Sequence, residues 1–292
     1  MTVLEKILSY ASLIRFSHTI FALPFALASI ALAWPAHPVT PRIFFWILLS
    51  MVGARSAAMG FNRLADRSFD SLNPRTRMWE LPQGKVQVWE AVLLTIAASL
   101  LFFFAAYELN FVCLVLSPVA LVIVFFYSFT KRFTWASHFF LGLALSIAPI
   151  GAWLAVSGTP NTAADLATPV FLGLAVLFWL AGFDIIYSLQ DREFDRQHGL
   201  HSMPVRFGVK GALTFSLVFH VLTVVFLIAV GFSANMGFIY WLGVAIVSVI
   251  LLWEHRIVSP TDLSRINRAF FDFNAYVSIG YFLTIICDLT WR

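Results

Sequence analysis

Residues 89–107 read WEAVLLTIAASLLFFFAAY, and after the short segment 108–110 the sequence resumes at 111–129 as FVCLVLSPVALVIVFFYSF. Each run has the length of a membrane-spanning helix, which takes about 20 mostly apolar residues. The connection between the two runs is too short for anything larger than a turn. This stretch therefore predicts two consecutive transmembrane helices, and it decides the kind of fold.

The composition of the whole chain has the same character. Of the 292 residues, 60% are hydrophobic and 12% are charged, with a mean hydropathy of +0.86. A soluble domain carries about twice that charged fraction, so these residues cannot build a water-facing surface. The 31 Phe and 10 Trp residues suit side chains that face lipid or an apolar substrate. The composition predicts an all-α, polytopic membrane protein.

Apolar runs recur along the chain and predict about nine transmembrane helices in a bundle. No low-complexity linker separates them, so we expect a single domain over residues 1–292. The sequence Ala31-Leu32-Ala33 resembles a signal-peptide cleavage site, but Pro24 interrupts the apolar run and we expect no cleavage. The predicted spans lie at about 16–34, 43–64, 89–107, 111–129, 136–156, 167–189, 211–232, 238–253 and 269–289.

Basic residues indicate which helix ends face the cytoplasm. Lys and Arg collect in alternate connections, whereas the opposite side shows only Arg42 and Arg292. Cytoplasmic segments attract basic residues, so we expect a cytoplasmic N-terminus and a location in a bacterial inner membrane. The basic side holds Lys6, Arg15, Arg63, Arg67, Arg75, Arg77, Lys85, Lys131, Arg132, Arg192, Arg196, Arg206, Lys210, Arg256, Arg265 and Arg268.

The two long polar connections, at about 66–88 and 190–210, begin with the same pattern. The first reads Asp66-Arg67-Ser68-Phe69-Asp70 and the second Asp191-Arg192-Glu193-Phe194-Asp195. Four predicted spans separate the copies, so both open on the same side of the membrane. The repeat predicts two pseudo-repeated halves, roughly 1–131 and 132–292, related by an axis along the membrane normal.

The spacing within the repeated motif predicts its chemistry. The two acids of each copy are four residues apart, so on a continuing helix they would face the same way. Asn62 and Tyr187 would extend these faces one turn deeper. Two such faces opposite each other would gather four carboxylates, which repel one another unless cations lie between them. Oxygen ligands without His or Cys favour Mg²⁺ or Mn²⁺ over Zn²⁺, and Mg²⁺ commonly bridges carboxylates to phosphates.

Basic residues near the motifs complete this picture, because Arg67, Arg192, Arg206 and Lys131 could hold phosphate oxygens. The pattern therefore predicts a magnesium-diphosphate site. A single acidic motif at a helix end is more often a solvated terminus, and only the symmetric duplication favours function. A secondary transporter would place its polar groups near the midplane. A CDP-alcohol phosphotransferase would need a denser single motif.

Three further residues are candidates with ordinary alternatives. Tyr127 and Lys131 share a helix face, so Tyr127 could line the site, or the pair could be an interfacial Tyr and a snorkelling Lys. Arg15 could bind the carboxylate of an aromatic acid, or it could be a positive-inside flank. His18 could line that pocket, or it could be a helix-packing histidine.

The chain resembles the UbiA-type intramembrane prenyltransferases, especially the 4-hydroxybenzoate polyprenyltransferase-like branch. The resemblance covers nearly the whole chain. Where many relatives are expected to have Arg in the first long connection, this chain has Trp79, and Arg77 could substitute for it. Besides the two motifs, the resemblance rests on Arg15-Phe16-Ser17-His18-Thr19, Phe21-Ala22-Leu23-Pro24, Asn62-Arg63, Asn73-Pro74-Arg75-Thr76, Leu81-Pro82, Gly84, Tyr127 with Lys131, and Ala269-Phe270-Phe271 with Asn274.

The resemblance implies a nine-helix bundle around a central cavity, capped on the cytoplasmic side by helical segments of the two long connections. It implies two Mg²⁺ ions bridged by the substrate diphosphate. It assigns charge neutralisation on the diphosphate to Arg67, Lys131 and Arg206. It assigns the metal ions and the diphosphate to Asn62, Asp66, Asp70, Asp191 and Asp195.

The implied partners are a polyprenyl diphosphate, a small aromatic acid and the lipid bilayer, with no nucleic acid. Loss of diphosphate leaves an allylic carbocation, which aromatic faces can stabilise, and Tyr127 and Tyr187 are the candidates for that role. Attack by an electron-rich ring carbon and loss of the ring proton complete the transfer. A menaquinone-pathway acid and a heme or chlorophyll precursor remain alternative acceptors.

Overall fold

The computed structural model describes residues 3–14 and 19–291. In this part of the chain the secondary structure is helical, and a single isolated bridge, Ser259 with Asp262, is the only β-type pairing. Eight helices are long and apolar enough to cross a membrane, and the shorter apolar helix Phe21–Ala33 adds a further candidate. The prediction of an all-α, polytopic membrane protein is confirmed, and the expected number of about nine spans agrees with this count.

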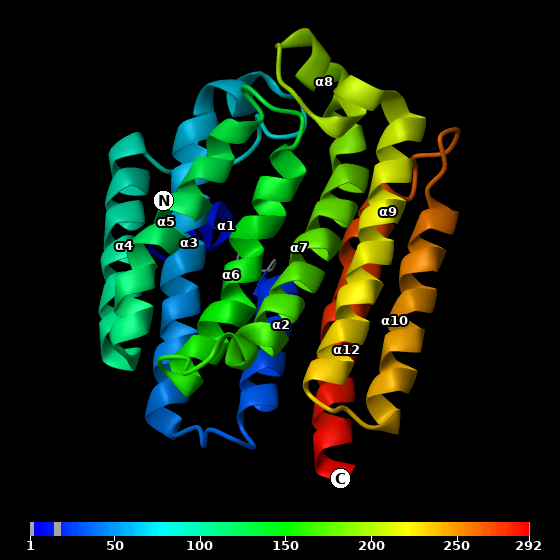
Figure 1. The fold of residues 1–292 in the computed structure, drawn as a ribbon. Coiled ribbons are helices and arrows are strands. Elements are labelled where there is room, and N and C mark those ends of the chain that lie inside the picture. Colours follow the sequence, from blue (N-terminus) through cyan, green and yellow to red (C-terminus); the bar gives the residue numbers. More distant parts are fainter. Residues whose placement is uncertain (1–2, 15–18, 292) are drawn as a thin grey trace. The chain divides into compact units, whose positions relative to one another are not determined.

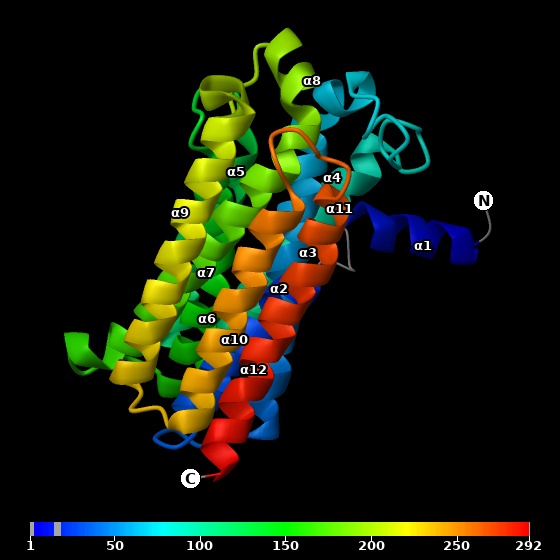
Figure 2. The same cartoon turned by 90° about the vertical axis from the view of Figure 1, so that its right-hand side faces the viewer.

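The helices follow the predicted spans closely, and Figures 1 and 2 draw them as ribbons coloured along the sequence. Short turns of a different geometry lie next to some of them: the 3₁₀ turns η2 (Ala163–Leu166) and η3 (Leu189–Asp191), and the π-helical turn η4 (Ala269–Phe273). The α-helices are α1 (Val3–Leu13), α2 (Thr19–Ala33), α3 (Pro41–Leu72), α4 (Val88–Leu109), α5 (Phe111–Thr130), α6 (Ser137–Ser157), α7 (Ala167–Ser188), α8 (Arg192–Gln197), α9 (Met203–Ser233), α10 (Phe238–Ile257), α11 (Ile266–Arg268) and α12 (Asn274–Trp291).

Contacts divide the chain into two compact units. The first contains residues 1–19 and 40–129, and the second contains residues 20–39 and 130–292. The first unit is thus built from α1, α3, α4 and nearly all of α5. The second unit is built from α6 to α12 together with α2 from Ile20 onward, so α2 packs with helices that follow it much later in the chain.

In the first unit, α3 and α4 pack closely along one line of small residues. A Cβ atom added to Gly53 would lie 2.9 Å from the backbone nitrogen of Phe102. Thr40 caps the start of α3 by accepting a hydrogen bond from the Ile43 amide at 3.3 Å, and Pro41 fits the first helical turn. Large apolar side chains of α4 and α5 are exposed, as a lipid-facing surface requires. They include Leu93, Leu100, Phe104, Val119 and Val122.

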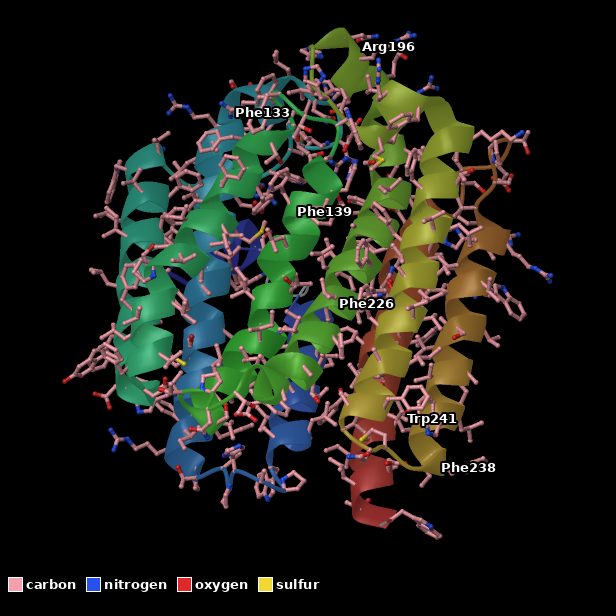
Figure 3. All side chains as sticks on the ribbon, viewed as in Figure 1. Phe133, Phe139, Arg196, Phe226, Phe238 and Trp241 are labelled. Atoms are coloured by element: carbon pink, nitrogen blue, oxygen red, sulfur yellow. The ribbon has the colours of Figure 1, made fainter. Side chains whose placement is uncertain are left out.

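In the second unit, α7 is the most deeply buried span, and Figure 1 shows it between α6 and α9. In its most apolar window 67% of the residues are buried, compared with 22–33% for the other spans. A row of aromatic rings packs across the three helices. The centroids of Phe139 and Phe178 are 6.1 Å apart, and those of Phe178 and Phe226 are 5.7 Å apart. Figure 3 labels Phe139 on α6 and Phe226 on α9. From α2, Phe25 packs on Trp179 with centroids 4.9 Å apart.

Gly142 sets the distance between α6 and α7, and its replacement by Ala is expected to destabilise the protein. The added Cβ atom would lie 2.3 Å from the carbonyl oxygen of Leu177, which is backbone and cannot rotate away. We expect Gly142→Ala to lower the free energy of unfolding by about 1–3 kcal/mol, measured by thermal unfolding in detergent. Gly151→Ala is the control, because a Cβ at this position of the same helix meets open space. Equal unfolding temperatures for the two variants would contradict the close approach.

Candidate functional site

The first acidic motif lies on one continuous helix, as its spacing predicts. Helix α3 extends past the predicted end of the span to Leu72, and it carries Asn62, Asp66 and Asp70 on successive turns. The Asn62 side-chain amide donates a hydrogen bond to Asp66 Oδ2 at 2.9 Å and another to Ser128 Oγ at 3.4 Å. Asp66 is partly buried and Asp70 is 9% exposed. The first unit therefore presents one amide and two carboxylates along one helix face.

Arg63 is part of this surface, although the sequence indicated only a basic flank. Its guanidinium Nη1 lies 3.7 Å from Asp70 Oδ2, and its Nε donates to the carbonyl oxygen of Leu13 at 3.5 Å. The guanidinium carbon is also 3.7 Å from the ring centroid of Trp79. Trp79, where Arg was expected in relatives, thus stacks on an arginine that comes from α3. The spacing of Arg63 and Asp70, two helical turns, is the signal that could have identified this pair.

The second acidic motif does not continue its span as a regular α-helix. Helix α7 ends at Ser188, Asp191 lies in the 3₁₀ turn η3, and Asp195 lies in α8. In the first copy the α-helix is therefore continuous from Asn62 to Asp70, whereas in the second copy the 3₁₀ turn that ends at Asp191 follows Tyr187 and α8 begins directly after it. Such 3₁₀ turns are common at helix ends. Both carboxylates are buried, with Asp191 5% and Asp195 2% exposed.

Lys131 contacts the last carboxylate of the second motif. Its ammonium nitrogen lies 3.2 Å from Asp195 Oδ2, and its carbonyl accepts a hydrogen bond from the His201 amide at 2.6 Å. Burial lowers the pKa of Lys131, but the carboxylates of Asp195, Asp191 and Asp184 raise it by more, so that its pKa lies above the ordinary value. Lys131 is therefore a permanent positive charge beside two of the predicted metal ligands.

The other predicted site residues differ in how firmly they are held. Arg192 Nε donates to the Pro204 carbonyl at 3.1 Å, so its side chain ties α8 to the start of α9. Arg67 and Arg206 are exposed and can reach a ligand without breaking a buried contact. Tyr127 is partly buried in the last turn of α5. Tyr187 stacks on Phe270, with ring centroids 4.0 Å apart and planes 29° apart.

The implied helical caps are found in one of the two long connections. Residues 190–202 contain the short helix α8, whereas residues 73–87 fold as consecutive turns. Arg15 and His18, the predicted residues for an acidic acceptor, lie outside the described part of the chain.

One further polar pair was missed by the sequence reasoning. His138 Nδ1 lies 2.6 Å from Asp184 Oδ2, and the imidazole side chain is fully buried, whereas 20% of the Asp184 side chain is exposed. The pair joins α6 to α7, and the Asp184 carboxylate is one of those that raise the Lys131 pKa. The two residues are 46 positions apart, so spacing along one helix could not reveal the contact.

The donor atoms of the two motifs fit a hard divalent cation. They are one amide and four carboxylates, and such oxygen sets suit Mg²⁺ better than Zn²⁺. Each unit supplies two of the carboxylates. In residues 3–14 and 19–291, no group of three Asp, Glu, His or Cys side chains lies close enough together to hold a metal ion. The convergence of the two motifs on one diphosphate stays a prediction.

Comparisons with known proteins point to one family. The model of the UbiA prenyltransferase family matches residues 22–278. The 4-hydroxybenzoate octaprenyltransferase of Nitrosospira multiformis is 31% identical over 100% of this chain and 99% of its own length. That of Cronobacter sakazakii is 30% identical over 96% of this chain and 94% of its own.

Solved structures with the same fold include a UbiA homolog from Aeropyrum pernix K1, with a TM-score of 0.85 and 35% identity over 94% of this chain and 98% of its own. The UbiA homolog from Archaeoglobus fulgidus bound to GPP and Mg²⁺ has a TM-score of 0.70 and 23% identity, covering 96% of this chain and 99% of its own. The second likeness concerns the fold alone.

Proposed function

Since the chain belongs to the UbiA prenyltransferase family, we propose that this aromatic polyprenyltransferase transfers a polyprenyl group from its diphosphate to 4-hydroxybenzoate or a closely related aromatic acid in quinone biosynthesis. Relatives that carry the name 4-hydroxybenzoate octaprenyltransferase match it over almost their whole length, which supports this acceptor. A transporter function and a CDP-alcohol phosphotransferase function have no comparable support.

The observation that carries the proposal is the repeated acidic motif with a cation held beside it. Asp191 and Asp195 are buried, and Lys131 contacts Asp195 at 3.2 Å. Buried carboxylates are costly without positive charge nearby, and Mg²⁺ would add such charge to that of the Lys131 ammonium group. We assign two Mg²⁺ ions to Asn62, Asp66, Asp70, Asp191 and Asp195, and the diphosphate oxygens to Arg67, Lys131, Arg192 and Arg206.

When bound, Mg²⁺ supplies positive charge that stabilises the departing diphosphate. The basic side chains add donors to the same oxygens. The allylic C–O bond breaks with its electron pair on the diphosphate, and the ring faces of Tyr127 and Tyr187 stabilise the allylic cation. A ring carbon of the acceptor forms the new C–C bond and loses its proton. Arg15 and His18 hold the acceptor in this proposal.

The protein is an integral, multi-pass membrane protein. We place the site at the cytoplasmic face of a bacterial inner membrane, because the basic residues collect at the ends of the spans that carry the two motifs. The polyprenyl tail would lie along the apolar helices in contact with lipid.

Turnover by membranes that express the chain tests the proposal. Labelled octaprenyl diphosphate is supplied with 4-hydroxybenzoate, with a dihydroxynaphthoic acid, or with phenol, each with Mg²⁺ and with a chelator. We expect Mg²⁺-dependent product from one aromatic acid, formed at least about tenfold faster than from phenol because only the acid can pair with a basic side chain. Equal use of phenol, or no product from either aromatic acid, would contradict the proposed acceptor class.

A further inference from the structure

The last span begins with an irregular turn that a single side chain completes. The π-helical turn η4 precedes α12, and its wider hydrogen-bond spacing leaves carbonyl oxygens that need other donors. Asn274 is the first residue of α12, and its side-chain amide donates to the carbonyl oxygens of Ala269 at 3.1 Å and Phe270 at 3.2 Å. This side chain is completely buried. Asn274 therefore holds the geometry of the turn from the inside.

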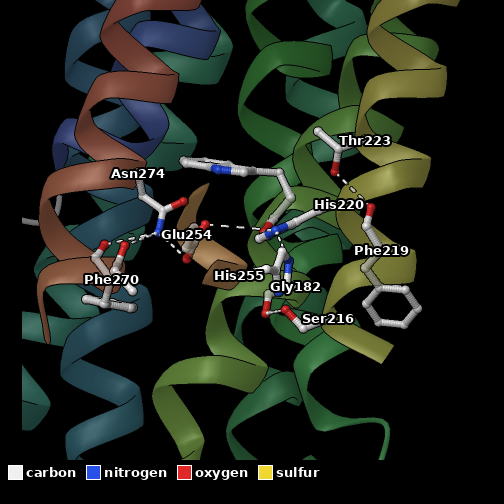
Figure 4. Close-up of polar contacts among 11 residues, drawn as sticks. Gly182, Ser216, Phe219, His220, Thr223, Glu254, His255, Phe270 and Asn274 are labelled. Carbon is white, nitrogen blue, oxygen red and sulfur yellow. Dashed lines mark hydrogen bonds and ion pairs between the residues drawn. The ribbon is translucent and has the colours of Figure 1, made fainter. Parts of the chain in front are cut away.

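A buried network of polar side chains in the second unit holds Asn274 in place (Figure 4). Glu254 of α10 is 0% exposed, and its Oε1 accepts from the Asn274 amide at 3.5 Å. Its Oε2 lies 3.9 Å from His220 Nδ1, and that nitrogen is 2.9 Å from His255 Nε2. The other ring nitrogen of His220 faces the Trp179 carbonyl at 3.3 Å, so it must be a donor. The network thus joins α7, α9, α10 and α12.

Glycine at position 182 lets the network reach α7. A Cβ atom there would lie 2.4 Å from the His220 ring, so the imidazole packs directly on the backbone of this helix. The Ser216 hydroxyl adds a hydrogen bond to the Gly182 carbonyl at 2.7 Å (Figure 4). Since α7 also carries Tyr187 and leads into Asp191, the network is anchored to the helix that positions the second acidic motif.

The π-helical turn contacts the proposed site through Phe270. Phe270 is 5% exposed, and its ring stacks on Tyr187 with centroids 4.0 Å apart. It also packs edge-on against Phe183 at 5.3 Å, so it cannot move without disturbing α7. Tyr187 is therefore backed on one side by a fixed ring that belongs to the turn.

Fully buried polar groups such as Asn274 and Glu254 are costly in a membrane-spanning bundle and call for a role. We propose that Asn274 and Glu254 are positioning residues for prenyl transfer. They fix the turn η4, the turn holds Phe270, and Phe270 keeps the ring of Tyr187 in place as a wall beside the allylic cation. This inference rests on the proposed function. The cation has two fates: it forms a C–C bond with the acceptor ring, which loses its proton, or it forms a C–O bond with water, which loses a proton to give prenyl alcohol.

The ratio of prenylated acid to prenyl alcohol measures this role, because a displaced ring wall admits water and weakens stabilisation of the cation. In Asn274→Leu, which keeps the volume but lacks the N–H donors, we expect the ratio to fall by about tenfold. Glu254→Leu removes the acceptor for Asn274 and should act in the same direction. Glu254→Gln keeps an acceptor oxygen, so its ratio should stay within about twofold of the wild-type ratio.

Asp288→Ala is the matched control for loss of a buried network in the same unit. Asp288 is 2% exposed and accepts from the Gly237 amide at 2.8 Å and the Tyr240 amide at 3.0 Å, at the far ends of α10 and α12. The Asp288→Ala variant should have a lower unfolding temperature and an unchanged ratio of prenylated acid to prenyl alcohol. Parallel falls in temperature and ratio for all three Ala and Leu variants would show that the network serves stability alone.

The two proposals fail in distinguishable ways. A wild-type protein that prenylates no aromatic acid would end both of them. A wild-type protein that does so, together with an unchanged product ratio in Asn274→Leu, would overturn the positioning role only. If Asn274→Leu does not insert in the membrane, the comparison of Glu254→Leu with Glu254→Gln decides, since equal ratios for these two variants would also overturn it.

Discussion

Replacing either Asp66 or Asp191 with alanine is expected to reduce prenyl transfer by about a thousandfold, the cost of losing a main charge-stabilising group in an active site. Each residue is the first acid of its motif. Asp66 is held by the Asn62 amide at 2.9 Å, and Asp191 is 5% exposed in the turn η3. Each unit supplies only two of the four carboxylates in the proposed site. No other carboxylate of the motifs could therefore take over the metal-binding role of Asp66 or Asp191.

Turnover of labelled polyprenyl diphosphate in membranes with equal amounts of inserted protein measures this effect. Asp262→Ala serves as the control. Asp262 is an exposed acid in a loop of the second unit, so its substitution removes the same charge away from the motifs. Full turnover by either motif variant would show that one acidic motif suffices, and the paired magnesium-diphosphate site would then be wrong.

The second large effect is expected from Lys131→Met, which removes the ammonium group beside Asp195. We expect turnover to fall by about a hundredfold, because one donor to the departing diphosphate is lost. The Asp195 carboxylate, 2% exposed, would also lose its partner at 3.2 Å. A buried acceptor left without its donor costs about 1–3 kcal/mol of folding free energy, so the unfolding temperature should fall as well.

Two further variants separate charge from structure at this position. Lys131→Arg keeps the positive charge and should recover part of the activity. Lys210→Met removes the same charge from an exposed site and should leave turnover and unfolding temperature close to the wild-type values. If Lys131→Met lowered stability but left kcat unchanged, Lys131 would be a partner of Asp195 without a part in the reaction.

Much of the fold follows from the sequence because membrane spans are recorded in uninterrupted stretches of apolar residues. The predicted spans agree with the helices, and the extension of α3 through Asp66 and Asp70 agrees with the four-residue spacing. In the second copy the 3₁₀ turn Leu189–Asp191 separates α7 from α8. A turn of three residues leaves no periodic signal in the sequence.

The site was predicted in part for a similar reason. The repeated motif predicted the four Asp residues, but it could not predict which side chains contact them or lie near them. Arg63 contacts Leu13 and Trp79, and His138 contacts Asp184 across two helices. Asn274 was recognised as a mark of the resemblance without a role, because its partners are carbonyl oxygens of a π-helical turn that the sequence does not reveal.

The burial of α7 has a consequence for how the protein tolerates change. This helix meets neighbouring side chains on most of its circumference, so each of its residues must match a partner in shape. Helices α4 and α5 instead have many exposed apolar side chains, where one apolar residue can replace another at little cost in stability. Adaptation to bilayers of different thickness or fluidity can therefore accumulate on α4 and α5, while the helix that leads to the second acidic motif keeps its sequence.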